Sequence, residues 1–336
     1  MIISVAATAV VSFLLSWLIG FRLVPWLRAL KLGQVINEIG PTWHKYKEGT
    51  PTMGGLMFIA GTLLASACGY LLLINTTDTS MSVDMSIEWK RLVINLVCCL
   101  AFALIGFDDD YHKIMNHQNM GLTAMQKIVL QVIVSAAYLI AMHFWGSCST
   151  TIWLPFFGDV EFGFLYYPLM VFSIVGIVNA VNLTDGVDGL AGSATMVAAV
   201  GFMVISSLLN NPGNLILSAA VGASLIGFLY WNFKPAKVFM GDTGSMFLGG
   251  AVVAMSFGCK REFLMLVSGV LFVIEAFSDI IQVLYFKATH GKRIFKMAPI
   301  HHHFEMCGWS EEKIVAVFSI ISLVGSLISI YMTMIS

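Results

Sequence analysis

Long apolar stretches alternate with short polar connections along the whole chain. Ten stretches are long enough to cross the ~30 Å hydrocarbon core of a bilayer, so the sequence predicts an all-α integral membrane protein with ten transmembrane helices. With no repeat of fixed period and no low-complexity linker, residues 1–336 are expected to form a single domain. The predicted helices cover residues 2–24, 53–74, 92–107, 124–144, 164–181, 189–209, 214–231, 240–258, 263–286 and 312–334.

Composition supports the membrane prediction and excludes some functions. Hydrophobic residues make up 58% of the chain and charged residues only 11%, whereas soluble domains carry about 25% charged residues. The net charge is −1 and no region is basic enough to indicate a nucleic-acid partner. The six cysteines show no CxxC spacing, which favours small buried apolar residues over a metal or redox site.

The basic residues predict how the helices are oriented. No basic residue precedes the first apolar run, which is too long for a signal-peptide core and is expected to remain as a span. With the N-terminus outside, fourteen of the 18 lysines and arginines fall at inner loops or inner helix ends. The positive-inside rule therefore predicts both termini outside and five cytoplasmic loops. In an outer loop, TIWLPFFGDVEFG at 151–163 predicts a small β-hairpin.

Polar residues capable of chemistry are concentrated in the five predicted inner loops. Because these loops share one membrane face, we expect them to form a single cytoplasmic active site. They are HKYKEGTPTMGG at 44–55, DDDYHK at 108–113, NLTDGVDG at 182–189, NFKPAKVFMGDTGS at 232–245 and KMAPIHHHFE at 296–305.

Six aspartates lie in three of these loops. Short carboxylate ligands suit Mg²⁺, which binds few carboxylates and leaves its other positions to water and substrate phosphates. Helix capping is the alternative, and it applies best to the two aspartates in the glycine-containing loop at 182–189. It explains three consecutive aspartates at a lipid boundary poorly. The six are Asp108, Asp109, Asp110, Asp185, Asp188 and Asp242.

Two glycine-rich loops indicate a phosphate site. PTMGG and MGDTGS place small residues where an inner loop enters a helix, so backbone N–H groups would face an anion. Lys47 lies five residues before Thr52, and Asp242 lies inside the second loop. This combination favours a pyrophosphate site over ordinary turns.

Other residues allow two interpretations each. Adjacent His301, His302 and His303 suit phosphate or sugar hydrogen bonds better than one zinc ion, because neighbouring side chains point apart. Glu275, Asp279 and Gln282 share a face of the ninth predicted helix and could line the site or join helices. Phe239 could pack at the membrane interface or stack on a nucleobase.

The loops together resemble a known family. KxGTPTMGG, GFxDDYxK, NLTDGxDGL, NFxPAKVFMGDTGS and PIHHHFE are similar, in this order, to the motifs of the phospho-N-acetylmuramoyl-pentapeptide transferases. The resemblance implies a Mg²⁺-dependent enzyme of the bacterial plasma membrane that acts in peptidoglycan synthesis. It implies transfer of phospho-MurNAc-pentapeptide from its UDP carrier to undecaprenyl phosphate, giving lipid I and UMP, by a homodimer.

The implied location is the bacterial plasma (inner) membrane, which the chain would cross several times, with its active site on the cytoplasmic face. The implied partners are UDP-MurNAc-pentapeptide, undecaprenyl phosphate, membrane lipid and a second copy of the chain. Within the wider superfamily of polyprenyl-phosphate N-acetylaminosugar-1-phosphate transferases, an enzyme that uses UDP-GlcNAc is the alternative. A secondary transporter would also carry intramembrane acids, but its polar groups should lie at the midplane.

The family motifs also imply roles for individual residues. Asp109, Asp110, Asp242 and Lys113 match catalytic positions, with Asp242 as the magnesium ligand, while Asp108 occupies a variable position of the motif. We expect a single in-line displacement in which Asp109 removes the proton of the lipid phosphate; a covalent aspartyl-phosphate is the rival. The positions matching the nucleotide-sugar pocket are Lys47, Thr52, Asn182, Asp185, Asp188, Asn232, Phe239, Gln282, His301 and His302.

Overall fold

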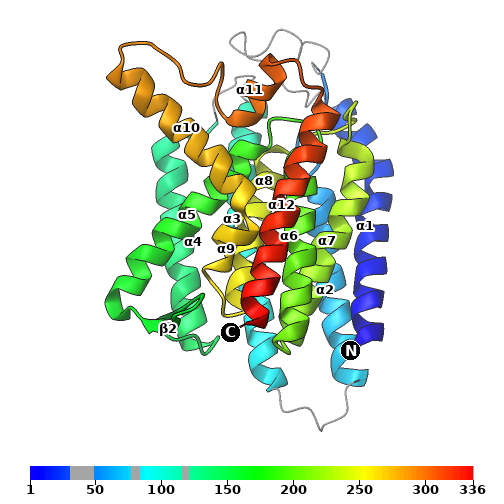
Figure 1. Cartoon of the computed structure of the whole chain (residues 1–336). Helices are drawn as coiled ribbons and strands as arrows, with labels where there is room; N and C mark the ends of the chain where they lie inside the picture. The colour runs from blue at the N-terminus through cyan, green and yellow to red at the C-terminus, as the bar shows by residue number, and fades with distance from the viewer. Residues whose placement is uncertain (31–48, 77–83, 116–120, 336) are drawn as a thin grey trace.

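The computed structural model describes residues 1–30, 49–76, 84–115 and 121–335 (Figure 1). Lys47 lies outside these ranges. Apart from one short 3-10 turn and one two-stranded sheet, the regular structure of the described residues is α-helical. The helices are α1 Ile2–Ala29, α2 Leu56–Thr76, α3 Met85–Met115, α4 Ala124–Phe144, α5 Tyr166–Thr184, α6 Leu190–Leu208, α7 Pro212–Asn232, α8 Gly241–Gly258, α9 Leu264–Ser268, α10 Val270–Ala288, α11 Ile300–Met306 and α12 Glu311–Met334.

Nine of the ten predicted apolar segments each overlap one α-helix, and the segment 263–286 overlaps two, α9 and α10. Among the described residues, eight helices are long and apolar enough to cross a membrane, which confirms a helical protein with several candidate spans. The other two predicted spans are α8 and α10. Nearly all of α8 is buried in protein, so its side chains do not have to be as apolar as those that face lipid. Helix α10 carries three charged residues, Glu275, Asp279 and Lys287. The count of ten crossings therefore stays a prediction.

Three boundaries differ from the prediction. The segment 263–286 is not one helix, because it is interrupted at Gly269, where a Cβ would lie 2.3 Å from the carbonyl oxygen of Met265. The stretch at 108–113 is not a loop but the end of α3, and the histidine stretch forms α11. At 1.5 Å per residue, α3 is about 46 Å long, so its last turns extend past a ~30 Å hydrocarbon core.

Close contacts around α8 place it at the centre of the bundle. Its residues from Thr243 to Gly258 are all buried. A Cβ on Gly249 of α8 would lie 2.7 Å from the Cα of Val178 in α5. On the other side, a Cβ on Gly106 of α3 would lie 2.1 Å from the carbonyl oxygen of Asp242. Small residues of this kind let membrane helices approach closely.

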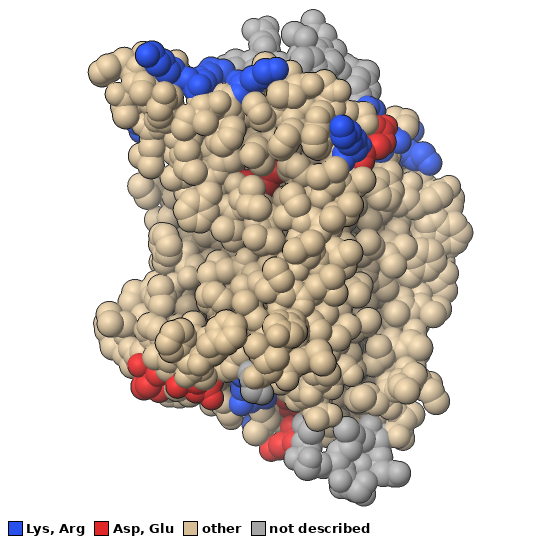
Figure 2. All heavy atoms as spheres, in the orientation of Figure 1, with Lys and Arg blue, Asp and Glu red and all other residues tan. Residues whose placement is uncertain are grey.

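The two ends of the molecule differ. Both termini lie at the end that carries the hairpin, and α11 lies at the opposite end with the start of α12 (Figure 1). The hairpin is confirmed: β1 Thr151–Leu154 pairs antiparallel with β2 Gly158–Glu161. Charged side chains gather at the two ends of the visible face, with few across the band between them (Figure 2). This distribution fits a membrane-crossing bundle.

The contact between α3 and α8 generates a stability prediction. Gly106→Ala should lower the midpoint of thermal unfolding in detergent, because overpacking typically costs about 1–3 kcal/mol. The matched control is Gly176→Ala in α5, where a Cβ would meet no atom within 4 Å. That variant should be neutral or slightly more stable. Equal destabilisation by both substitutions would contradict the packing argument.

Candidate active site

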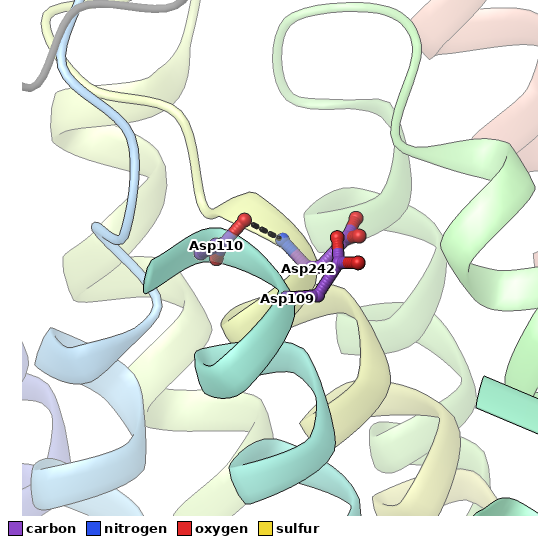
Figure 3. Close-up of side chains that lie close together, drawn as sticks. All are labelled: Asp109, Asp110 and Asp242. Atoms are coloured by element: carbon purple, nitrogen blue, oxygen red, sulfur yellow. Dashed lines mark hydrogen bonds between the residues drawn. The ribbon is translucent and has the colours of Figure 1, made fainter. Parts of the chain in front are cut away.

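Three aspartates from two helices form one cluster. Asp109 and Asp110 lie in the last turns of α3, and Asp242 lies in the first turn of α8. One carboxylate oxygen from each lies within 4.8 Å of the others (Figure 3). Within the described ranges, this is the one group of three or more histidine, cysteine or acidic residues that could hold a metal ion. The structure thus brings together the three predicted catalytic aspartates.

Asp110 is fixed by the beginning of α8. Its carboxylate accepts hydrogen bonds from the backbone N–H of Asp242 at 3.1 Å and of Thr243 at 2.9 Å. The hydroxyl of Thr243 donates to it at 2.7 Å. Figure 3 shows the side chain turned toward this helix start. A carboxylate is favoured at a helix N-terminus, where N–H groups lack partners, so Asp110 joins α3 to α8.

Asp109 and Asp242 share two lysines. The Nζ of Lys113 lies 2.6 Å from Oδ2 of Asp109 and 3.0 Å from Oδ2 of Asp242. The Nζ of Lys127 lies 2.9 Å from each of the same two oxygens. Two carboxylates about 4 Å apart repel by about 4 kcal/mol at an effective dielectric of ~20, and the two ammonium groups offset this cost.

Lys127 was not among the predicted site residues. It lies in the first turn of α4, directly after a capping box formed by Thr123 and Gln126. A lysine near a helix N-terminus opposes the helix dipole, so it needs an anionic partner elsewhere. That mismatch was the available sequence signal, but only the structure shows that the partners are Asp109 and Asp242.

Two more predicted residues lie beside the cluster. The side-chain amide of Asn182 donates to Oδ1 of Asp242 at 2.9 Å and to the hydroxyl of Ser245 at 2.7 Å. Thr52 lies near Gly241, where a Cβ would be 2.7 Å from the threonine Oγ1 and 2.5 Å from Oδ2 of Asp110. Gly241 has a φ of 73°, which glycine adopts without strain.

Backbone pairing explains how Thr52 reaches this place. The backbone N–H of Phe239 donates to the carbonyl oxygen of Pro51 at 2.8 Å, and Gly54 N–H donates to the carbonyl of Phe239 at 2.8 Å. The two glycine-rich loops of the sequence therefore lie side by side. Phe239 itself is half-buried next to the cluster's helix start, and its stacking on a base stays a prediction.

The NLTDGVDG loop is joined to the loop after α7. Asp188 accepts a hydrogen bond from the backbone N–H of Ala236 at 3.1 Å. Asn232 accepts from Gly189 N–H at 3.0 Å and donates to the carbonyl oxygen of Val238 at 3.0 Å. Asn232 is buried, so these bonds give it a structural role in the loop region. Asp185 is half-buried and caps the C-terminus of α5.

Side chains of α10 contact the segment that contains the three histidines. The amide of Gln282 donates to the carbonyl oxygen of Phe295 at 2.9 Å and accepts from the N–H groups of Ile294 and Phe295, each at 3.0 Å. His301 Nδ1 lies 3.0 Å from Oε2 of Glu275. His302 Nδ1 lies 2.6 Å from a carboxylate oxygen of Glu305.

Asp108 is separate from the aspartate cluster. Its side chain is half exposed and lies 3.6 Å from the imidazole of His112, one turn along α3. Successive helical residues point in different directions, so Asp109 and Asp110 face α8 while Asp108 does not. The structure thus places Asp109 and Asp110 in the cluster and Asp108 outside it.

The donor atoms of the cluster fit a divalent cation. Carboxylate oxygens are the hard ligands that Mg²⁺ prefers, and the three aspartates supply them within one small volume. The two lysine ammonium groups lie against Oδ2 of Asp109 and Oδ2 of Asp242, which shows that positive charge is stabilised there. The arrangement could hold a metal ion beside positively charged groups, as phosphoryl-transfer sites require.

Comparison with known proteins agrees with this geometry. Residues 92–260 match the family model Glycosyl transferase family 4, and residues 47–59 match Phospho-N-acetylmuramoyl-pentapeptide-transferase signature 1. The chain is 44% identical over 325 residues to the phospho-N-acetylmuramoyl-pentapeptide-transferase of Clostridioides difficile, covering 96% of each chain. It is 42% identical over 326 residues to that of Bacillus subtilis, again covering 96% of each. The chain therefore belongs to the phospho-N-acetylmuramoyl-pentapeptide transferase family.

Proposed function

We propose that this protein transfers phospho-MurNAc-pentapeptide from UDP-MurNAc-pentapeptide to undecaprenyl phosphate, forming lipid I and releasing UMP. The observation that carries the proposal is the cluster of Asp109, Asp110 and Asp242 with two bridging lysines. Family membership supplies the substrate class. The proposed location is the bacterial plasma membrane, with the cluster at its cytoplasmic face.

The reaction must bring two anions together. A lipid phosphate attacks a pyrophosphate, so catalysis depends on placement and charge stabilisation. Lys113 and Lys127 supply positive charge to the substrate phosphate oxygens that approach Asp109 and Asp242. Mg²⁺, when held by Asp242 and its neighbours, would neutralise the pyrophosphate and stabilise the leaving UMP.

Asp109 is the proposed general base. It is buried, and the backbone N–H of Leu122 donates to its Oδ1 at 2.7 Å, which fixes the carboxylate while Oδ2 faces the lysines. Asp110 holds the start of α8 so that Asp242 keeps its place. Labelled phospho-sugar retained on the protein without lipid would instead indicate a covalent aspartyl-phosphate step.

The remaining parts of the proposal concern the partners. Ten residues would contact or shape the nucleotide-sugar pocket. They are Lys47, Thr52, Asn182, Asp185, Asp188, Asn232, Phe239, Gln282, His301 and His302. Leu284 and Phe286 on α10 are exposed, and they support a route along this helix for the polyprenyl chain. We further propose that the protein acts as a homodimer.

The direct test uses purified protein in detergent. With UDP-MurNAc-pentapeptide and undecaprenyl phosphate, UMP should form, while UDP-GlcNAc should give none. Chelation with EDTA should abolish UMP release, and added Mg²⁺ should restore it. UMP formed only from UDP-GlcNAc would assign the protein to the related GlcNAc-1-phosphate transferases.

The three consecutive aspartates should differ in this assay. Asp109→Ala should lower kcat by about 10²- to 10⁴-fold, the range for a positioned general base. Asp110→Ala should also lose activity because α8 loses its N-terminal acceptor. Asp108→Ala should keep most activity, since exposed ion pairs contribute about 0–1 kcal/mol. Equal losses at all three positions would refute the assignment.

Lys127 should matter as much as Lys113. Lys127→Gln should reduce kcat by about 10²- to 10³-fold, as expected for a group that stabilises developing charge. Lys260→Gln, at the hairpin end of the molecule, is the control and should behave like wild type. Full activity of Lys127→Gln would show that the bridge seen here is only structural.

A further inference from the structure

Glu275 is a buried acid that the proposed reaction does not use. It lies in α10, and its side chain and that of His301 are both 0% exposed. Ionisable residues within membrane helices are costly and usually have a specific partner. Here the partner is the imidazole, whose Nδ1 lies 3.0 Å from Oε2 of Glu275.

This contact determines where the imidazole carries its proton. An ionised carboxylate can only accept a hydrogen bond, so opposite an ionised Glu275 the donor of this contact is Nδ1–H. The other ring nitrogen, Nε2, then faces away from α10. It lies against the NLTDGVDG loop, where a Cβ on Gly186 would be only 2.3 Å from it.

Each residue of the pair has a second polar atom that lacks a hydrogen-bond partner within the described part of the chain. Within the part of the chain that the structure describes, neither Nε2 of His301 nor Oε1 of Glu275 has a hydrogen-bond partner, although both atoms are buried. Leaving a buried polar atom unpaired costs free energy, so such an atom needs an explanation. Gly186 lies between Asp185 and Asp188, which places Nε2 beside two predicted substrate-binding residues.

A second contact fixes the position of the ring. The backbone N–H of Ile300 donates to the hydroxyl of Ser278 at 2.9 Å, and Ser278 lies three residues after Glu275 on α10. The start of α11 is therefore attached to α10 by the backbone of Ile300 and by the side chain of His301. Ring orientation is left to Glu275 and to the absence of a side chain at Gly186.

We propose that Glu275 is a positioning residue that holds His301 with Nδ1 protonated and Nε2 directed at the 185–188 turn. The nucleotide-sugar donor supplies the hydrogen-bonding partner that Nε2 lacks in the chain itself. This inference rests on the proposed function. It is analogous to the second partners that orient histidines in metal and catalytic sites.

The kinetic test compares Glu275→Gln with wild type. A glutamine can accept from Nδ1–H or donate to Nδ1, so it no longer selects one tautomer. We expect kcat/KM for the donor to fall about 10- to 100-fold, with KM for undecaprenyl phosphate unchanged. Glu262→Gln, which changes a buried glutamate at the hairpin end of the molecule, is the matched control and should leave both constants unchanged.

A double-mutant cycle separates positioning from general packing. If Glu275 acts through His301, Glu275→Gln should have little further effect in a His301→Gln background. Additive losses would overturn the proposal. Thermal unfolding of each variant identifies any that fail to fold, and Glu275→Asp, which keeps the carboxylate, should recover part of the activity.

A spectroscopic test does not depend on turnover. In ¹⁵N-histidine-labelled protein, the signals missing from His301→Gln identify His301, and their shifts report which ring nitrogen carries hydrogen. Wild type should show protonated Nδ1, and Glu275→Gln should lose this preference. Hydrogen on Nε2 alone in wild type would overturn the proposal. Absence of UMP release by wild type would instead reject the proposed function.

Discussion

Asp109 and Asp242 can lie together only because Lys113 and Lys127 lie between them. The four side chains come from three helices, α3, α8 and α4, so this set of ion pairs fixes the ends of all three. Removing both lysines would leave the buried carboxylate of Asp109 beside the half-buried carboxylate of Asp242 without compensation. The same positive charge is what a site for two phosphate-bearing substrates needs. Structural compensation and the proposed catalysis therefore make the same demand on these residues.

The approach of α3 to α8 is the second requirement. Gly106 lets the backbone of α3 touch the start of α8, and Asp110 then accepts the N–H groups exposed there. The absence of one side chain thus allows a helix start to be capped by a residue of another helix. Asp242 follows directly in α8, so its direction depends on this junction.

The position of the cluster also separates the possible functions. A transporter is expected to hold its polar residues near the membrane midplane, where alternating access can expose them to both sides. Here the cluster lies where α3 ends and α8 begins, at the end of the bundle opposite both termini. Asn182, Thr52 and the histidine helix α11 gather at that same end. Such a site suits a soluble substrate that meets a lipid at the membrane surface.

The sequence by itself determined the apolar segments, the hairpin, the family and the three aspartates that the fold brings together. Long apolar runs and consecutive motifs are local patterns, and local patterns survive in any tertiary arrangement. The sequence-based prediction placed the DDDYHK stretch in a loop and the segment 263–286 in one helix. Both predictions were wrong, because contacts with other helices decide these boundaries.

Only the tertiary structure decided which cations meet the aspartates. Lys127 is separated from Asp242 by 115 residues, so no local pattern connects them. The pairing of Glu275 with His301 and the loop contacts of Gln282 and Asn232 depend on helix packing in the same way. The sequence specifies which groups are available for chemistry, and the packing of the helices determines which of them touch.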